Sequence, residues 1–520
     1  MLLSLGAMAA NDTNNYYWVK FADKAGTPYT IDNPSKYLSQ RSLDRRQRLN
    51  IAVDSIDLPV NPAYVKAVAK TGARIHNVSK WLNGVTVIAT PKEVEKIEKL
   101  DFVKSVKLYN RRAVMVDTTT IKYDAGRDTT LLSYRPHDSN YYALAYSQIN
   151  QLNGVRLHRR GFEGQGVLVG VCDGGFPGVD TLSVFDTLRR SGRIVATRDF
   201  VAHRPSVYLA DAHGTMVLTT LAGYVPGKYV GTAPKADYVL CITEDNRTES
   251  PVEELNWVSA AEFLDSLGVD VINSSLGYRG FWDTTLNYKF EHLNGMTAFM
   301  SIGGEIAATR GILCVNSAGN EGSQGKHSIS VPADAEHILS VGAVWSNGNI
   351  SGFSSYGSTY DDRVKPDVCA QGVFVYVAAP AGGYIRAHGT SFSSPIMAGM
   401  MACLRQAAPK ASVEELCKAV RMAGNMADKV NNRYGYGIPD CGKALRAVGA
   451  SRLAGARAAK MSLGEQIGTE KKEGVENSGK KDGAERPALV RPMPSKKVHP
   501  KRIDIREKMR NRQMNNEEQK

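Results

Sequence analysis

Three side chains of this 520-residue chain have the residue types that nucleophilic acyl transfer requires: Asp173, His213 and Ser391. A serine hydroxyl becomes a strong nucleophile when an imidazole removes its proton, and a carboxylate behind the imidazole fixes the tautomer that the base needs. Each of the three lies within two residues of a glycine, which allows sharp turns and close backbone approaches. The residue types therefore suggest a hydrolytic site, provided that the fold brings them together.

The segment around Ser391, Gly389 to Pro395, marks the change from a tight turn to an apolar helix predicted from about Phe392 to Ala407. Gly389 permits a backbone conformation that other residues resist, and free N–H groups at a helix start favour negative charge beside Ser391. We expect Pro395 in the first turn, where a missing N–H has no intrahelical partner to lose. The alternative is that a hydroxyl of this segment only caps a core helix.

Asp173 and His213 also have ordinary structural interpretations. Asp173 ends a predicted strand, and an aspartate before Gly174 is a common turn. His213 opens a predicted helix that runs to Gly223, and a histidine there is often unremarkable in function. However, Gly214 directly after it allows the close packing that holds an imidazole in one position, as a general base requires.

The elements that must position these residues lie between about Tyr141 and Val448, where short apolar strands alternate with helices. This alternation is typical of an α/β fold, a doubly wound and mostly parallel sheet with helices on both faces. The predicted strands are 166–172, 238–242, 269–273, 312–316 and 338–343, and the predicted helices are 252–267, 297–309, 392–407 and 413–422. Ligands of such sheets bind beyond the carboxyl ends of the strands, so the site is expected there.

A smaller unit precedes this sheet. Its predicted elements follow a split βαβ order, which indicates a small ferredoxin-like α+β domain of about 100 residues. The strands are predicted from Tyr16 to Phe21 and at 73–78, 85–89 and 103–108, and the helices at 35–49, 62–70 and 91–100.

Four sequence blocks occur in a fixed order: Asp173-Gly174-Gly175, the stretch from His213 to Gly223, the stretch from Ser317 to Gly322, and the stretch from Gly389 to Pro395. They resemble the signature blocks of the subtilisin-like serine proteases, in which the triad runs in the order Asp, His, Ser. One block alone is a weak signal, but the set in this order is specific. The resemblance covers about Tyr141 to Val448.

The resemblance implies roles for individual residues. Ser391 would attack the scissile carbonyl, His213 would act as the base, Asp173 would fix the imidazole, and Asn320 would donate to the oxyanion. Two segments resemble those that flank an extended peptide substrate, and their residues are Ser274, Ser275, Leu276, Gly277, Ser317, Ala318 and Gly319. One departure is Gly174, because subtilisins commonly carry a hydroxyl residue there, and this leaves the support of Asp173 open.

Two further features separate the chain from the related serine-carboxyl peptidases. In that branch a glutamate takes the place of His213, and an aspartate takes the place of Asn320. The preference for the P1 side chain does not follow from the sequence. Glu244 and Asp245 could attract basic substrate residues or could simply be solvated.

Composition along the chain, together with the resemblance, predicts the organisation of the whole chain. We expect a signal-peptide remnant at 1–13, a propeptide-like α+β domain at 14–112, a linker at 113–140, a peptidase domain at 141–448 and a basic, disordered tail at 449–520 with a helix near 503–514. The propeptide-like domain would be an intramolecular inhibitor, and it could instead remain attached as a structural domain. The protein is expected to be secreted, periplasmic or at the cell surface.

The distribution of charge, the spacing of the cysteines and the lengths of the apolar runs argue against several other function classes. The tail holds 18 Lys and Arg against 10 Asp and Glu, so it supplies +8 of the formal net charge of +13, and no nucleic-acid partner is expected of the folded part. The seven cysteines show no metal-ligand spacing and are expected to be small buried hydrophobic residues. Calcium is common in the resembled family, but Asp361-Asp362 lacks a full ligand pattern, so no metal or other cofactor is predicted. No apolar run reaches the roughly 18 residues of a membrane span.

Two rival hypotheses remain from other classes. The chain could be a catalytically silent binding protein that uses this scaffold, or its tail could bind nucleic acid or an anionic surface. Polypeptides are the expected substrates, because the catalytic residue types are all present.

Overall fold

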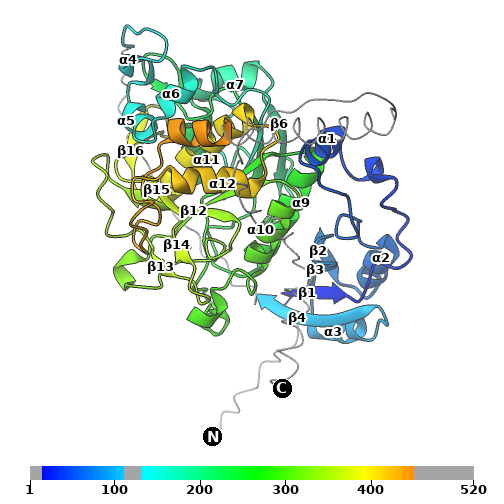
Figure 1. Ribbon diagram of the computed structural model, residues 1–520. Coiled ribbons are helices and arrows are strands. Elements are labelled where there is room, and N and C mark those ends of the chain that lie inside the picture. The colour runs from blue at the N-terminus through cyan, green and yellow to red at the C-terminus, as the bar shows by residue number, and fades with distance from the viewer. Residues whose placement is uncertain (1–13, 111–130, 450–520) are drawn as a thin grey trace, which may run out of the picture. The chain divides into compact units, whose positions relative to one another are not determined.

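The computed structural model describes residues 14–110 and 131–449 (Figure 1). The predicted leader, most of the predicted linker and the predicted helix near 503–514 lie outside the described residues. By their contacts, the described residues up to Arg446 form one compact unit.

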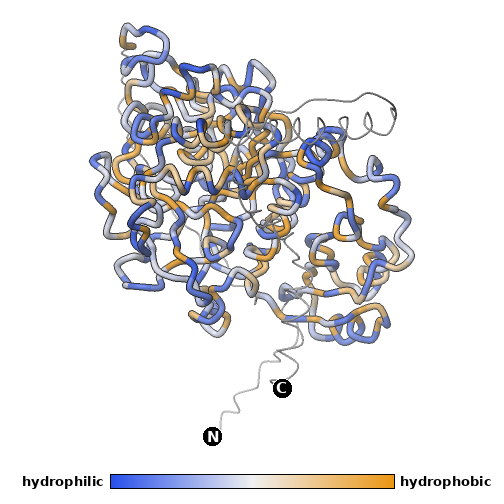
Figure 2. The backbone as a smooth tube through the Cα atoms, in the orientation of Figure 1, coloured by the Kyte–Doolittle hydropathy of each residue, from blue (hydrophilic) through white to orange (hydrophobic). Residues whose placement is uncertain are grey.

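A seven-stranded sheet forms the centre of the larger part of this unit, and its strands lie in the order β15-β12-β11-β10-β5-β9-β6. All neighbouring pairs are parallel. The bounds are β5 Leu168–Asp173, β6 Ile194–Asp199, β9 Asp237–Ile242, β10 Val271–Ser274, β11 Leu313–Ser317, β12 Ile338–Val344 and β15 Val368–Gln371. The central strands are buried runs of valine, isoleucine and leucine, as expected for a parallel sheet covered on both faces. Figure 2 shows these hydrophobic stretches gathered in the interior.

Helices cover both faces of the sheet, which confirms the predicted doubly wound α/β class. Two of them, α8 (His213–Ala222) and α11 (Thr390–Ala407), pack against each other and against the sheet. The second pair, α9 (Val252–Leu267) and α10 (Phe299–Thr309), does the same, and α12 (Val413–Met422) packs against α11.

The sheet has two strands that the sequence analysis did not predict, β6 and β15. β6 lies at one edge, its residues are mostly half-exposed, and it carries Arg198 and Asp199, so it lacks a continuous apolar run. β15 lies at the other edge and has only four residues. The pattern of β6 therefore differs from that of the buried central strands. β15 is fully buried, but its apolar run, Val368 to Ala370, is too short to mark a strand in the sequence.

Short elements complete this region of the chain. The helices are α4 (Ser139–Tyr142), α5 (Tyr146–Asn150), α6 (Gly154–His158) and α7 (Asp186–Arg190). The small hairpins pair β7 (Tyr224–Val225) with β8 (Tyr229–Val230), β13 (Gly357–Ser358) with β14 (Val364–Lys365), and β16 (Val375–Ala378) with β17 (Tyr384–Ala387).

The N-terminal region is a four-stranded antiparallel sheet in the order β2-β3-β1-β4, which confirms the predicted small α+β domain. Its strands are β1 (Asn15–Phe21), β2 (Arg74–Ser79), β3 (Gly84–Ala89) and β4 (Val103–Asn110), and its longer helices are α1 (Gln40–Arg48), α2 (Pro62–Lys70) and α3 (Pro91–Glu98). Its core contains Val19, Phe21, Val68, Val85 and Ile97.

The helix predicted at 35–49 is confirmed, but it begins later than predicted. The chain forms a 3₁₀ turn at Pro34–Lys36 and then begins α1 at Gln40. Ser39 adopts an extended backbone, and its side chain accepts a hydrogen bond from the backbone N–H of Ser42. A serine in this N-cap position satisfies a free donor of the helix start, which makes a new beginning more favourable than a continuous helix.

Seven buried cysteines carry free thiols, which confirms their predicted role as small hydrophobic residues. Within the described ranges, no helix has the length and apolar character that crossing a membrane requires.

Candidate active site

Asp173 and His213 meet where β5 ends and α8 begins. The Nδ1 atom of His213 lies 2.9 Å from Oδ1 of Asp173. Asp173 is fully buried, whereas the His213 side chain keeps 27% of its surface exposed. The backbone N–H of His213 also donates to Asp211 at 2.7 Å, which fixes the first residue of α8.

Gly214 makes this approach possible. A Cβ atom at this position would lie 2.3 Å from the carbonyl oxygen of Gly175 and 3.0 Å from Cβ of Asp173. The turn after β5 and the first turn of α8 are therefore in direct backbone contact, which only a glycine permits. The contact of Gly214 with Gly175 therefore brings the start of α8, and with it His213, close to Asp173.

One carboxylate oxygen of Asp173 accepts hydrogen bonds, and the other has no partner in the described residues. Oδ1 accepts from His213 and from the backbone N–H of Gly174 at 2.8 Å. Oδ2 is buried and has no hydrogen-bond partner among the described residues. Glycine at 174 offers no hydroxyl to this oxygen, so the departure noted in the sequence coincides with an unsatisfied acceptor.

Ser391 is the second residue of α11 and is 9% exposed. The N-cap residue is Gly389, with φ of 145°, a conformation that favours glycine. No side chain caps this helix start, so the interpretation of a hydroxyl as a simple cap does not describe it. The Ser391 hydroxyl instead donates to the backbone carbonyl of Ser275 at 3.3 Å.

The position predicted for Pro395 is wrong. α11 begins at Thr390, so Pro395 lies inside the helix, beyond the first turn. Its missing N–H would otherwise bond to the carbonyl of Ser391, four residues earlier. The hydroxyl of Ser275 supplies the missing donor and lies 2.8 Å from that carbonyl. Ser275 therefore compensates for the proline and fixes the backbone that carries Ser391.

Asn320 follows β11, and hydrogen bonds fix its side-chain oxygen. Its Oδ1 accepts from the backbone N–H of Thr390 at 3.0 Å, and the Thr390 hydroxyl lies 3.0 Å from the same oxygen. The amide nitrogen has no hydrogen-bond partner in the described part of the chain. The same nitrogen would lie 3.8 Å from a Cβ atom added at Gly389.

These residues share one cleft with a volume of about 800 Å³. His213, Asn320 and Ser391 line it, and so do five of the seven residues predicted to contact substrate: Ser275, Leu276, Gly277, Ser317 and Gly319. Ser274 and Ala318 are buried behind its wall. The Ser274 hydroxyl accepts from Trp257 Nε1 at 2.7 Å, and Ala318 belongs to a small core cluster. These two residues therefore support the wall without forming its surface.

Comparison with known protein families assigns both the region of the seven-stranded sheet and the N-terminal region. Residues 164–437, more than half of the chain, match the model of the subtilase family. The chain belongs to the subtilase family. Residues 16–123 match the peptidase S8 propeptide domain of Bacteroidota. This subtilase is therefore a serine-type endopeptidase with an N-terminal propeptide domain.

Similar proteins include several bacterial proteases. Subtilisin DY of Bacillus licheniformis is 30% identical over 54% of this chain and 92% of its own length. Subtilisin Savinase of Lederbergia lenta is 28% identical over 57% of this chain and 97% of its own length. The alkaline protease of Alkalihalobacillus alcalophilus is 27% identical over 70% of this chain and 85% of its own length.

The cleft of this subtilase is acidic, which the sequence analysis did not predict. Its ionisable acidic and basic side chains are Asp211, His213, Glu244, Glu249, Arg279 and Glu321. Glu244, for which two alternatives were left open, lines the cleft, and Asp245 pairs with Arg247 at 2.7 Å. The acidic residues come from separate segments, so no local pattern in the sequence marks them as a group.

Burial and neighbouring charges shift the pKa values at the site. Burial lowers the pKa of His213, but the charge and hydrogen bond of Asp173, together with Glu244 and Asp211, outweigh it and raise that pKa to about 9. Burial and the charge of Asp173 raise the pKa of Glu244 to about 8, although His213 acts in the opposite direction. Glu244 and His213 therefore influence each other's protonation.

The propeptide domain contacts α9 through buried polar groups. Glu262 of α9 accepts from the backbone N–H groups of Lys80 and Trp81 at 2.8 and 3.0 Å. Arg46 lies between Asp57 of its own domain and Asp265 of α9, with 2.9 Å to each carboxylate. Burial would raise the pKa of Asp265, but nearby cations, Lys80 first, lower it to about 2.

Two groups of described side chains have the spacing that a metal ion would need. Glu244, Glu249 and Glu253 form one beside the cleft, and His137, His158 and Glu163 form the other. The Asp361 carboxylate pairs with Arg363 at 2.9 Å, so the position considered for calcium in the sequence is occupied by an ion pair.

Proposed function

We propose that this subtilase hydrolyses peptide bonds of proteins through a triad of Asp173, His213 and Ser391 and an acyl-enzyme intermediate. The observation that supports this most directly is the 2.9 Å contact between Asp173 and the Nδ1 atom of His213, at the edge of the cleft that Ser391 also lines. A carboxylate accepts only, so in the neutral imidazole Nδ1 carries the proton and Nε2 keeps the lone pair that a general base uses.

The attacking step requires a small movement of the Ser391 hydroxyl. In the resting arrangement it donates to the carbonyl of Ser275. Rotation toward His213 would transfer its proton to Nε2 while Oγ bonds to the scissile carbonyl carbon. His213 would then give this proton to the leaving amine, and water would repeat the sequence to release the acyl group from Ser391.

Two donors would stabilise the oxyanion of each tetrahedral intermediate. The first is the side-chain amide of Asn320, which is oriented through its oxygen by Thr390. The second is the backbone N–H of Ser391, which belongs to the first turn of α11, where N–H groups have no intrahelical partner. Donors fixed before the reaction favour the developing charge without further reorganisation.

The lining of the cleft supports a preference for cationic peptides. Asp211, Glu244, Glu249 and Glu321 face the cleft, whereas Arg279 is the single lysine or arginine among its described lining residues. Above about pH 8, where Glu244 and Glu249 are ionised, we expect a peptide with lysine near the scissile bond to have a higher kcat/KM than its glutamate counterpart. Added salt would reduce the difference, since it screens charges.

We further propose that the propeptide domain inhibits the peptidase before it is removed, and that the protein acts outside the cytoplasm. The buried contacts of Arg46 and Glu262 across the two domains support the first proposal. The leader-like segment at Met1 to Ala10 supports the second. Cell fractionation with N-terminal sequencing of the mature protein tests both.

The test of the main proposal is casein hydrolysis by the purified protein beside a Ser391→Ala variant. We expect hydrolysis by the parent protein and its loss in the variant. Ser393→Ala is the matched control, because Ser393 is on the same helix and its hydroxyl has no hydrogen-bond partner in the described residues. Equal behaviour of parent and Ser391→Ala would favour a catalytically silent binding protein.

A further inference from the structure

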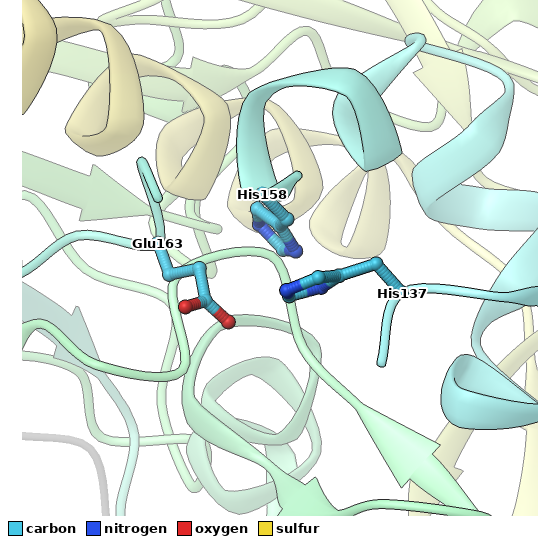
Figure 3. A group of neighbouring side chains, drawn as sticks. All are labelled: His137, His158 and Glu163. Carbon is cyan, nitrogen blue, oxygen red and sulfur yellow. The ribbon is translucent and has the colours of Figure 1, made fainter. Parts of the chain in front are cut away.

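Two histidines and a glutamate converge outside the cleft (Figure 3). His137 precedes α4, His158 is the last residue of α6, and Glu163 lies between α6 and β5. One potential ligand atom from each lies within 4.8 Å of the others. None of the three lines the cleft of Ser391, and none has a role in the proposed reaction.

The tautomer of His158 follows from its contacts. The Nε2 atom lies 3.0 Å from the backbone carbonyl of Thr232, which can only accept, so Nε2 carries the proton. The Nδ1 atom therefore has the lone pair, and it lies 2.9 Å from the hydroxyl of Tyr142. A ring N–H held by a backbone carbonyl, which leaves the lone pair on the other ring nitrogen, is the usual arrangement of a metal-binding histidine.

The same reasoning assigns His137. Tyr142 has one hydroxyl proton, and His158 Nδ1 must receive it because that nitrogen carries none. His137 Nδ1, 3.2 Å from the same hydroxyl, must then be a donor to the Tyr142 oxygen. This leaves the lone pair of His137 on Nε2, for which the described residues provide no hydrogen-bond partner. His137 is half-exposed, which gives an ion access from solvent.

Glu163 has a buried carboxylate oxygen without a hydrogen-bond partner in the described residues, an observation that is independent of the two histidines. The residue is 2% exposed, and its Oε1 atom has no hydrogen-bond partner within the described ranges. The other oxygen pairs with the ammonium group of Lys235 at 2.5 Å. A buried carboxylate oxygen without a partner is unfavourable, and a cation at Oε1 would satisfy it without breaking the pair with Lys235.

We propose that His137, His158 and Glu163 form a site for a divalent transition metal, with Zn²⁺ as the best match. The set of two imidazoles and one carboxylate suits zinc, with water as a fourth ligand, and it lacks the many oxygens that Ca²⁺ requires. Binding requires the Tyr142 hydroxyl to turn away from His158 Nδ1. The ion would tie the loop of His137 to the end of α6.

The test is zinc binding to the full chain in a Ser391→Ala background, which prevents autolysis. After treatment with a chelator and its removal, the protein is mixed with ZnCl₂, separated by gel filtration and analysed for bound metal. We expect the His137→Ala and Glu163→Gln variants to hold one equivalent less zinc than the parent. His388→Ala, which removes an exposed histidine elsewhere, should hold as much as the parent.

Thermal unfolding and cobalt spectroscopy provide readouts that do not depend on activity. Zinc should raise the Tm of the parent and of His388→Ala, but not that of Glu163→Gln, and CaCl₂ should not replace it. Co²⁺ should give a visible absorption band in the parent that Glu163→Gln lacks. Equal zinc content in parent, His137→Ala and Glu163→Gln would overturn the proposal, as would a parent that retains no zinc. Glu163→Gln keeps the size of the side chain, so a comparable Tm without zinc separates lost binding from misfolding.

Discussion

Ser275 and Ser391 exchange two hydrogen bonds, each from a hydroxyl to the other residue's backbone carbonyl. The Ser275 hydroxyl lies 2.8 Å from the Ser391 carbonyl, and the Ser391 hydroxyl lies 3.3 Å from the Ser275 carbonyl. The first bond replaces the helix bond that Pro395 cannot form, and the second holds the proposed nucleophile before substrate arrives. The residue after β10 and the start of α11 thus form one structural element.

This pairing predicts a specific double-mutant result. Ser275→Ala should lower the free energy of unfolding by about 1–3 kcal/mol, since it leaves the buried Ser391 carbonyl without a donor. Adding Pro395→Ala restores a backbone N–H four residues after Ser391, so the double variant should regain about 1 kcal/mol of this loss. Urea unfolding of the four proteins measures the coupling. Strictly additive effects would show that the two residues do not serve the same carbonyl.

Asn320→Ala should reduce kcat far more than it changes KM. In subtilisin, loss of one such donor reduces kcat by about 10²–10³-fold, and a similar factor is expected here because the amide acts on charge that develops in the transition state. Steady-state kinetics on a chromogenic peptide measures both constants. Gln324→Ala, at an exposed amide that also lines the cleft, should leave kcat nearly unchanged. Equal losses in the two variants would assign Asn320 only a general role in the cleft.

The pH dependence of kcat/KM should follow His213. The pKa of this residue is raised to about 9, and only the neutral imidazole accepts a proton, so kcat/KM should rise with pH up to and through about 9. Glu244→Gln removes a negative charge that favours the imidazolium, so the rise should move to lower pH. Asp245→Asn is the control, because Asp245 pairs with Arg247. A profile unmoved by Glu244→Gln but moved by Asp245→Asn would contradict this electrostatic account.

The contact between propeptide and peptidase should depend on Arg46. Arg46→Met leaves the carboxylates of Asp57 and Asp265 buried beside fewer cations. Removal of one partner of a buried ion pair costs about 3–5 kcal/mol of free energy. We expect a propeptide domain with this change, expressed separately, to inhibit the mature peptidase at least about 100-fold more weakly. Arg48→Met serves as a control, because Arg48 is partly exposed and its pair with Asp270 contributes less. Equal inhibition constants would place the binding energy elsewhere.

The sequence predicts those features of the fold and the site that depend on residues adjacent in the chain. Asp173 and His213 stand at the end of an apolar strand and the start of a helix, and the glycines beside them are required by backbone contacts such as that of Gly214 with Gly175. For the same reason the bounds of α9 and α12 agree with prediction, since each helix has a continuous local pattern.

Features that depend on distant contacts could not be predicted in this way. The compensation of Pro395 by Ser275 joins positions that are 116 residues or more apart, and the acidic cleft combines carboxylates from several loops. His137, His158 and Glu163 have no motif spacing, and only the fold brings them together. The edge strand β6 was missed because its exposed residues interrupt the apolar run, and the fully buried β15 was missed because its apolar run has only three residues, Val368 to Ala370.

The central claim is that the Ser391 hydroxyl is the nucleophile, and covalent labelling tests it most directly. The purified protein is treated with a fluorophosphonate, digested, and analysed by mass spectrometry to locate the modified residue, beside Ser391→Ala and Ser393→Ala. Modification of Ser391 in the parent and in Ser393→Ala, with none in Ser391→Ala, is the predicted result. A folded, casein-hydrolysing protein in which Ser391 stays unmodified, or a Ser391→Ala variant that is labelled and hydrolyses casein like the parent, would contradict it.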